Sequence, residues 1–140
     1  MNDLEGFRIL IVDDEPFMRA TIKAVLRAIG HFGVAEADDG DIAVGEVERF
    51  KPDVVLCDIS MPRMGGLQFV EQLRKHRAAR VRNTPVVILT GHADEATVLE
   101  AAQLQISGYL IKPVSPKLLR VQLQKVRGSS GDRVGGVGGS

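Results

Sequence analysis

The sequence has no tryptophan, one tyrosine and one cysteine, and its basic and acidic residues are equal in number. A single cysteine, Cys57, excludes an intramolecular disulfide, and its place inside an apolar run predicts a small buried core residue rather than a reactive thiol. The 18 basic and 18 acidic residues cancel, so no global field attracts nucleic acid or an anionic membrane. Any function that depends on charge must therefore be local.

Long apolar segments are also absent. No uninterrupted apolar run approaches the roughly 20 residues that a membrane span requires. The N-terminal residues, MNDLE, have neither the basic region nor the apolar core of a signal peptide. These absences predict a cytoplasmic protein with no membrane partner.

The remaining composition, 44% hydrophobic and 26% charged over 140 residues, is typical of one soluble globular domain. We expect this domain to occupy residues 1–127. Residues 128–140 are rich in Gly and Ser and have no periodic apolar pattern, so we expect a flexible tail or linker there.

Short apolar runs alternate with amphipathic segments along the chain. The runs predict five strands, at residues 7–12, 33–37, 54–58, 86–89 and 108–111. Apolar residues at helical spacing predict five helices, which begin near residues 16, 40, 66, 94 and 116. Strands and helices that alternate with short connections favour an α/β fold, in which helices cover both faces of a parallel sheet.

A basic stretch, residues 74–82, follows the third predicted helix. Six of its nine residues are Arg, Lys or His, and no aromatic residue lies among them. We interpret the stretch as a solvated helix end whose cations complement the carbonyl end of the helix dipole, rather than as a phosphate-binding patch. The sequence therefore predicts no nucleic-acid partner.

Polar residues stand at the end of four predicted strands. Asp13 and Asp14 follow the first strand, and Asp58 ends the third. Thr90 follows the fourth strand and Lys112 the fifth. Each has an ordinary alternative role, as a helix cap or a solvated side chain. In open parallel sheets, however, ligands bind beyond the carboxyl ends of the strands, so their joint placement there predicts a binding site.

The types of these residues indicate what they could bind. Carboxylates that converge repel one another unless they shift their pKa values or hold a cation, and oxygen ligands favour Mg²⁺. Lys112 and Thr90 would supply a positive charge and a hydroxyl donor to the oxygens of a phosphoryl group. A carboxylate can itself accept that group, and Asp58, on the central strand, is the candidate.

Over about residues 6–127 the chain resembles the receiver domain of two-component response regulators. The resemblance rests on four motifs in order: Asp13-Asp14, the string DISMPRMGG from Asp58, Thr90-Gly91, and GYLIKP from Gly108 to Pro113. It implies a flavodoxin-like, doubly wound, five-stranded parallel sheet of order 2-1-3-4-5 with five helices.

By this resemblance, Asp58 accepts a phosphoryl group from a phosphohistidine on a sensor histidine kinase or a phosphotransfer protein. Asp14, Asp58 and the backbone carbonyl of Ser60 would bind Mg²⁺ directly, and Asp13 would bind it through water. The resemblance also makes the protein a switch, which catalyses only its own phosphorylation and dephosphorylation. Its phosphoryl group would be held by Lys112, by the Thr90 hydroxyl, by Ser60 and by the N–H group of Gly91.

The resemblance further implies how the phosphorylated state is transmitted. Tyr109 would move inward into space vacated by Thr90, and the Lys112–Pro113 bond would be cis. The fourth helix, fifth strand and fifth helix would then engage a target protein, an output domain or a second copy of the chain. Leu118 and Val121 lie off the core stripe of the last helix, so we expect them to be partly exposed on this face.

Two positions that the family pattern does not fix, Ser60 and His92, are expected to tune the lifetime of the phosphorylated state. The main alternative is a magnesium-dependent phosphatase or phosphotransferase with an aspartyl nucleophile. Such enzymes of the haloacid dehalogenase type have a second Asp at the position of Ser60 and usually a cap domain, for which 140 residues leave no room. A nucleotide-binding protein is disfavoured, because no phosphate-binding loop motif follows the first strand.

Overall fold

The computed structural model describes residues 4–91 and 103–135, with side chains as far as residue 128. Five parallel strands form one sheet with the order β2-β1-β3-β4-β5, which confirms the predicted topology. The strands are β1 (Arg8–Val12), β2 (Gly33–Ala37), β3 (Val54–Asp58), β4 (Val86–Thr90) and β5 (Gly108–Ile111).

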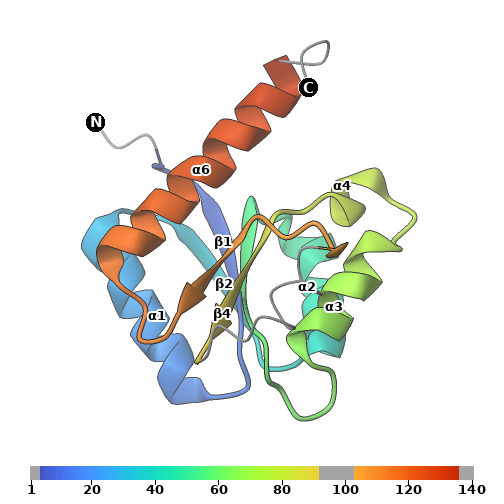
Figure 1. The fold of residues 1–140 in the computed structure, drawn as a ribbon, viewed down its shortest axis with the longest axis horizontal. Coiled ribbons are helices and arrows are strands. Elements are labelled where there is room, and N and C mark those ends of the chain that lie inside the picture. The colour runs from blue at the N-terminus through green and yellow to red at the C-terminus, as the bar shows by residue number, and fades with distance from the viewer. Residues whose placement is uncertain (1–3, 92–102, 136–140) are drawn as a thin grey trace.

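Helices cover both faces of this sheet, as Figure 1 shows. On one face lie α1 (Pro16–Ile29) and α6 (Pro116–Gly135), and on the other lie α2 (Gly40–Phe50), α3 (Gly66–Arg74) and the short α4 (Ala79–Arg82). In the part of the chain that is described, no helix has the length and apolar character to cross a membrane.

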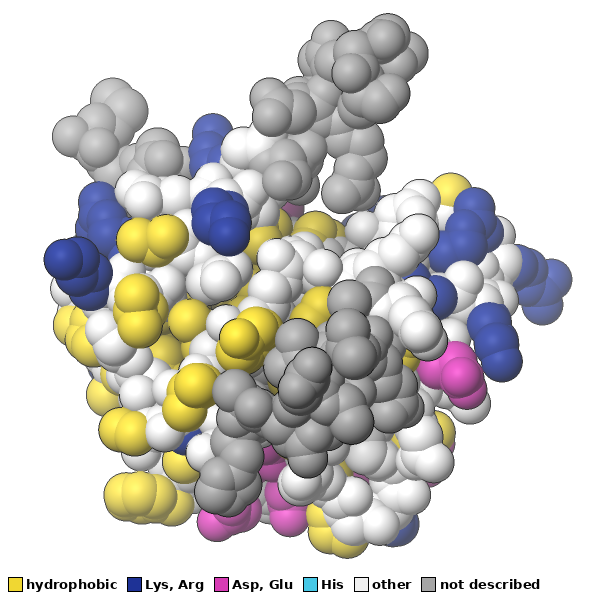
Figure 2. Space-filling view, viewed as in Figure 1, with side chains coloured by type: hydrophobic (Ala, Val, Ile, Leu, Met, Phe, Trp, Pro, Cys, Tyr) yellow, Lys and Arg dark blue, Asp and Glu magenta, His cyan; other side chains and the backbone are white. Residues whose placement is uncertain are grey.

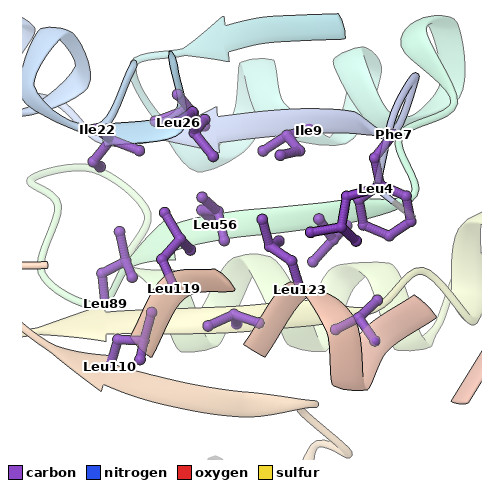
Figure 3. Close-up of a cluster of buried hydrophobic side chains, with 14 residues drawn as sticks. Leu4, Phe7, Ile9, Ile22, Leu26, Leu56, Leu89, Leu110, Leu119 and Leu123 are labelled. Carbon is purple, nitrogen blue, oxygen red and sulfur yellow. The ribbon is translucent and has the colours of Figure 1, made fainter. Parts of the chain in front are cut away.

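Two hydrophobic cores form because successive strand residues point to opposite faces. Ile9 and Ile11 of β1 pack with α1 and α6, whereas Leu10 and Val12 pack with α2 and α3. Figure 3 shows the first core, in which side chains of β1, β3 and β4 meet Ile22 of α1. Burial on both faces explains why the central strands are continuous apolar runs in the sequence.

Two helical segments differ from the predictions. Helix α6 continues to Gly135, so the first eight residues of the expected tail, 128–135, have a helical backbone. No proline follows Pro116 in this helix, so every later residue keeps the N–H that helix continuation needs. The short helix α4 was not predicted, and the helix predicted over 94–105 lies largely outside the described residues.

The basic stretch that follows α3 donates hydrogen bonds from its arginines to backbone carbonyl oxygens. The Arg80 guanidinium donates to the carbonyls of Val47 and Glu48 in the last turns of α2. Arg74 and Arg82 donate to further carbonyls, those of His76, Arg77, Arg82, Thr84, Leu104 and Gln105. These arginines therefore link loops and helix ends at the amino edge of the sheet, opposite the carboxyl ends of the strands.

Helix α3 begins directly against the end of β3. The Gly66 N–H donates to the Ile59 carbonyl at 3.0 Å. A Cβ on Gly66 would lie 2.3 Å from the Asp58 carbonyl oxygen, closer than non-bonded atoms approach, and 3.0 Å from the Ile59 Cα, which is also tight. Only glycine allows this contact, which sets the position of the backbone that carries Asp58.

We expect Gly66→Ala to lower the free energy of unfolding by about 1–3 kcal/mol, the usual cost of forcing an extra carbon into a packed site. Gly45→Ala is the matched control, since a Cβ there meets nothing within 4 Å. It should stabilise α2 by about 0.5–1 kcal/mol, because alanine favours helix interiors over glycine. Urea denaturation of both variants measures the difference, and a Gly66→Ala protein as stable as the wild type would contradict the close contact.

Candidate functional site

The polar residues singled out in the sequence lie at the carboxyl edge of the sheet. Asp58 and Thr90 are the last residues of β3 and β4, and Lys112 directly follows β5. Asp13 and Asp14 follow β1, the neighbour of β3. Acidic side chains are visible at the lower edge of Figure 2, the edge toward which the strands of Figure 1 run. The fold therefore brings these five side chains to one edge.

Three carboxylates form a cluster at this edge. Asp13, Asp14 and Asp58 each have a carboxylate oxygen within 4.8 Å of the others. Asp13 is fully buried and Asp58 is 6% exposed, whereas Asp14 is half-buried. Such a set of closely spaced oxygens, open on the side of Asp14, has the chemistry to hold a hard dication.

Lys112 supplies the positive charge that faces the cluster. Its Nζ lies 3.0 Å from Asp58 Oδ1 and 3.5 Å from Asp13 Oδ2. Its backbone N–H donates to the Thr90 carbonyl at 2.8 Å, which anchors the lysine to the end of β4. The Lys112–Pro113 bond is cis, as the resemblance implied. One ammonium group thus contacts two carboxylates that come from different strands.

Burial and neighbouring charges shift the ionisation of this group of residues. Burial raises the pKa of Asp58, the Lys112 ammonium opposes this rise, and the Asp13 carboxylate adds to it, so that the pKa ends above its usual value. The pKa of Lys112 is also raised: burial opposes this change, and the contacts with Asp58 and Asp13 outweigh it. The lysine therefore keeps its charge, and the cluster favours a further cation.

Cys57 is buried beside this cluster, as expected. Burial raises the pKa of its thiol far above the usual range, and the carboxylates of Asp58 and Asp13 add to the rise. The thiol donates to the Asp58 carbonyl oxygen at 3.2 Å. It therefore stays protonated and has no role as a nucleophile.

The backbone around Asp13 is held by contacts that the sequence analysis missed. Arg19 of α1 donates to the Asp13 carbonyl at 2.6 Å and forms an ion pair with Glu36 of β2. The Glu15 N–H donates to Asp13 Oδ1 at 2.9 Å. Arg19 lies one helical turn after the start of α1, but the sequence pattern does not reveal which carbonyl its guanidinium reaches.

The remaining predicted site residues surround the cluster to different degrees. Thr90 is buried and Tyr109 is 39% exposed, so the tyrosine ring is not fully packed in this structure. Ser60 and Gly91 are exposed, and the backbone N–H of Ser60 acts to lower the pKa of Asp58, against the effect of burial. His92 lies outside the described residues. Its tuning role, with Ser60, stays a prediction that the phosphate-release rate of the Ser60→Ala, His92→Ala variant would test.

An apolar surface lies on β5 and α6. Leu118 is 55% exposed and Val121 is 44% exposed, as expected from the helix pattern, while Leu119 and Leu123 are buried. Ile111 of β5 is also half exposed. Figure 2 shows hydrophobic side chains gathered over the part of the molecule where β5 and α6 lie in Figure 1. We call Tyr109, Ile111, Leu118 and Val121 the β5–α6 surface.

Comparisons with known proteins agree with this geometry. A family model described as the response regulator receiver domain matches residues 9–124. The chain is 35% identical over 119 residues to the chemotaxis protein CheY of Pseudomonas aeruginosa, covering 85% of this chain and 94% of that protein. It is 34% identical over 122 residues to CheY-3 of Vibrio cholerae, with 87% and 92% covered.

Solved structures give the same result. The chemotaxis protein CheY4 of Vibrio cholerae, crystallized at low pH, superposes with a TM-score of 0.78 at 30% identity. The match covers 86% of this chain and 98% of that one.

Among longer relatives, the probable transcriptional regulator ycf27 of Guillardia theta is 34% identical over 119 residues, and the match covers 44% of its length.

The raised pKa of Asp58 predicts a pH-dependent difference in stability between the wild type and Asp58→Asn, which resembles the protonated acid. Between the ordinary carboxyl pKa and the raised one, the folded state binds more protons than the unfolded state, so wild-type stability falls as pH rises. Without metal, the variant should therefore be the more stable protein at neutral pH. Urea unfolding with a chelator present measures the difference.

The two proteins should approach equal stability below about pH 4, where the carboxyl group is protonated in both the folded and the unfolded state. A wild type that is more stable than Asp58→Asn at neutral pH without metal would contradict the raised pKa.

Proposed function

The chain belongs to the receiver-domain family of two-component response regulators, whose members are phosphorylation-dependent signalling switches, and from this premise we propose that Asp58 is its phosphoacceptor. The donor is a phosphohistidine on a histidine kinase or a phosphotransfer protein. One observation carries the proposal: the Asp58 carboxylate lies within 3.0 Å of the Lys112 ammonium and within 4.8 Å of the other two acids. No other group of three acidic, His or Cys side chains among the described residues is so placed.

Mg²⁺ fits the donor set of this site, because three carboxylates and a nearby backbone carbonyl are hard oxygen ligands. Asp14, Asp58 and the carbonyl of Ser60 would hold the ion directly, with Asp13 acting through water. When bound, Mg²⁺ neutralises negative charge on the carboxylates and on the oxygens of the transferring phosphoryl group.

The residues of the chain have separate roles in the transfer. An Asp58 oxygen attacks the phosphorus, the bond from phosphorus to the donor nitrogen breaks, and the imidazole leaves as an acyl phosphate forms. Lys112, which contacts Asp58 Oδ1 before transfer, then pairs with a phosphoryl oxygen. Thr90 and the N–H groups of Ser60 and Gly91 complete the set of donors.

Transmission follows from the charge that this group adds. The phosphoryl oxygens attract the Thr90 hydroxyl, and Tyr109 on the neighbouring strand moves inward as Thr90 does. The partial exposure of Tyr109 supports this step, because an inward movement would bury more of its side chain. The β5–α6 surface then binds the target, which is a downstream protein, an output domain or a second copy of the chain.

The aspartyl phosphatase alternative lacks a specific observation in its favour. Such an enzyme needs an acid two residues after the nucleophile, and Ser60 offers only an exposed hydroxyl there.

Incubation with acetyl phosphate and Mg²⁺ tests the proposal directly. We expect the intact mass of the wild type to increase by one phosphoryl group, because the small donor needs no docking surface. Asp58→Asn should remain unmodified, and so should the wild type when a chelator removes the metal. Equal labelling of wild type and variant would place the acceptor elsewhere, and an unlabelled wild type would reject the phosphoacceptor role.

The β5–α6 surface makes a second prediction. Leu118→Glu should weaken phosphorylation-dependent binding of the target or the second copy by about tenfold or more, because it places a charge in an apolar contact. Phosphorylation by acetyl phosphate should be unchanged, since Leu118 is exposed and none of the proposed site residues belongs to α6. Sedimentation of the phosphorylated protein, alone and with the target, measures the effect.

Arg127→Glu is the matched control, because it changes an exposed charge on the same helix, away from the face that carries Leu118 and Val121. Unchanged binding by Leu118→Glu would exclude the β5–α6 surface.

A further inference from the structure

The loop between β3 and α3, residues 59–65, leaves the sheet at Asp58 and carries Ser60. Backbone hydrogen bonds hold its ends: the Ile59 N–H donates to the Leu89 carbonyl at 3.1 Å, and the Gly66 N–H closes the loop onto Ile59. Between these points Ser60 is exposed to solvent. Met61, the next residue, is buried in the core, and two further contacts hold the residues that follow it.

An ion pair supplies the first such contact. The Arg63 guanidinium is hydrogen-bonded to the Asp39 carboxylate at the start of α2. The Arg63 side chain is 73% exposed, whereas the Asp39 side chain is only 5% exposed. The other Asp39 oxygen accepts the Ile42 N–H at 2.9 Å and so caps α2. The arginine thus ties the loop to a carboxylate that the helix already fixes.

A second contact joins the residues that directly follow the ion pair in α2 and in the loop. Gly40 follows Asp39, and Met64 follows Arg63. A Cβ on Gly40 would lie 2.6 Å from Met64 Sδ, so the methionine occupies space that the missing side chain leaves open. We call the Asp39–Arg63 ion pair and the Gly40–Met64 contact the loop clamp.

We infer that the loop clamp positions Ser60 for phosphoryl transfer, with Asp39 and Arg63 as positioning residues that do not touch the reacting atoms. The inference rests on the proposed function. Ser60 lies two residues after Asp58, and its carbonyl belongs to the proposed metal ligands and its N–H to the proposed phosphoryl donors. Together with the buried Met61, fixing Arg63 and Met64 limits the conformations open to the exposed Ser60 and Pro62, so less order has to be gained when metal and phosphoryl group bind.

Arg63→Ala tests this role. We expect about a tenfold loss in Mg²⁺ affinity and in the rate constant for phosphorylation by acetyl phosphate, the size usual for residues that orient metal ligands. Calorimetric titration with Mg²⁺ and time-resolved intact mass give the two values. Arg63→Lys should restore most of both, because it keeps the charge.

Asp39→Asn removes the charge from the other side of the clamp and keeps the cap, because an asparagine oxygen also accepts the Ile42 N–H. It should cause the same loss as Arg63→Ala. The double variant should lose no more than either single variant, because the two residues act through one contact.

Arg49→Ala is the matched control, since it breaks the ion pair of Arg49 with Glu46 on the same helix and leaves the loop untouched. It should behave as the wild type does. The inference is overturned if Arg63→Ala matches the wild type, if lysine fails to restore it, or if the losses of the double variant multiply. A wild type that acetyl phosphate does not label rejects the proposed function instead, and the Mg²⁺ titration still tests the clamp.

Discussion

Three carboxylates and one ammonium group meet at the carboxyl edge of the sheet, and the structure around them serves to keep them together. Asp13 and Asp58 have almost no contact with solvent, so their repulsion is weakly screened. Lys112 contacts both but offers one positive charge against three negative ones. The site therefore stays short of positive charge, and a bound cation would correct this.

Contacts on the backbone beside the carboxylates oppose this repulsion. Arg19 holds the backbone at Asp13, and the close approach of Gly66 holds the backbone at Asp58. The central strands β1 and β3 are buried on both faces of the sheet, so the helices packed there restrict their movement. The packing of the two hydrophobic cores thus holds the repelling carboxylates in place, and the free energy of that packing offsets the repulsion.

The strands and the five polar residues at their ends were predictable because each depends on local sequence. Apolar runs fix a buried strand, and parallel strands place their ends at one edge. The contacts of Arg19, Arg63 and Arg80 were not predictable, because a long side chain can reach many carbonyls or carboxylates and only the fold selects one. Helix α4 was missed for a similar reason, since its four residues are too few to show a periodic pattern.

Helix α6 has a mechanical consequence. Its 20 residues make a rod of about 30 Å, of which Leu119, Leu123 and Val126 are packed into the core. The remaining turns extend past the sheet in Figure 1. A small tilt of the packed part, of the kind that repacking beside β5 would cause, is multiplied along the rod into a larger displacement at Gly135. The packed part of the helix, in the core beneath the β5–α6 surface, would be the pivot of this movement.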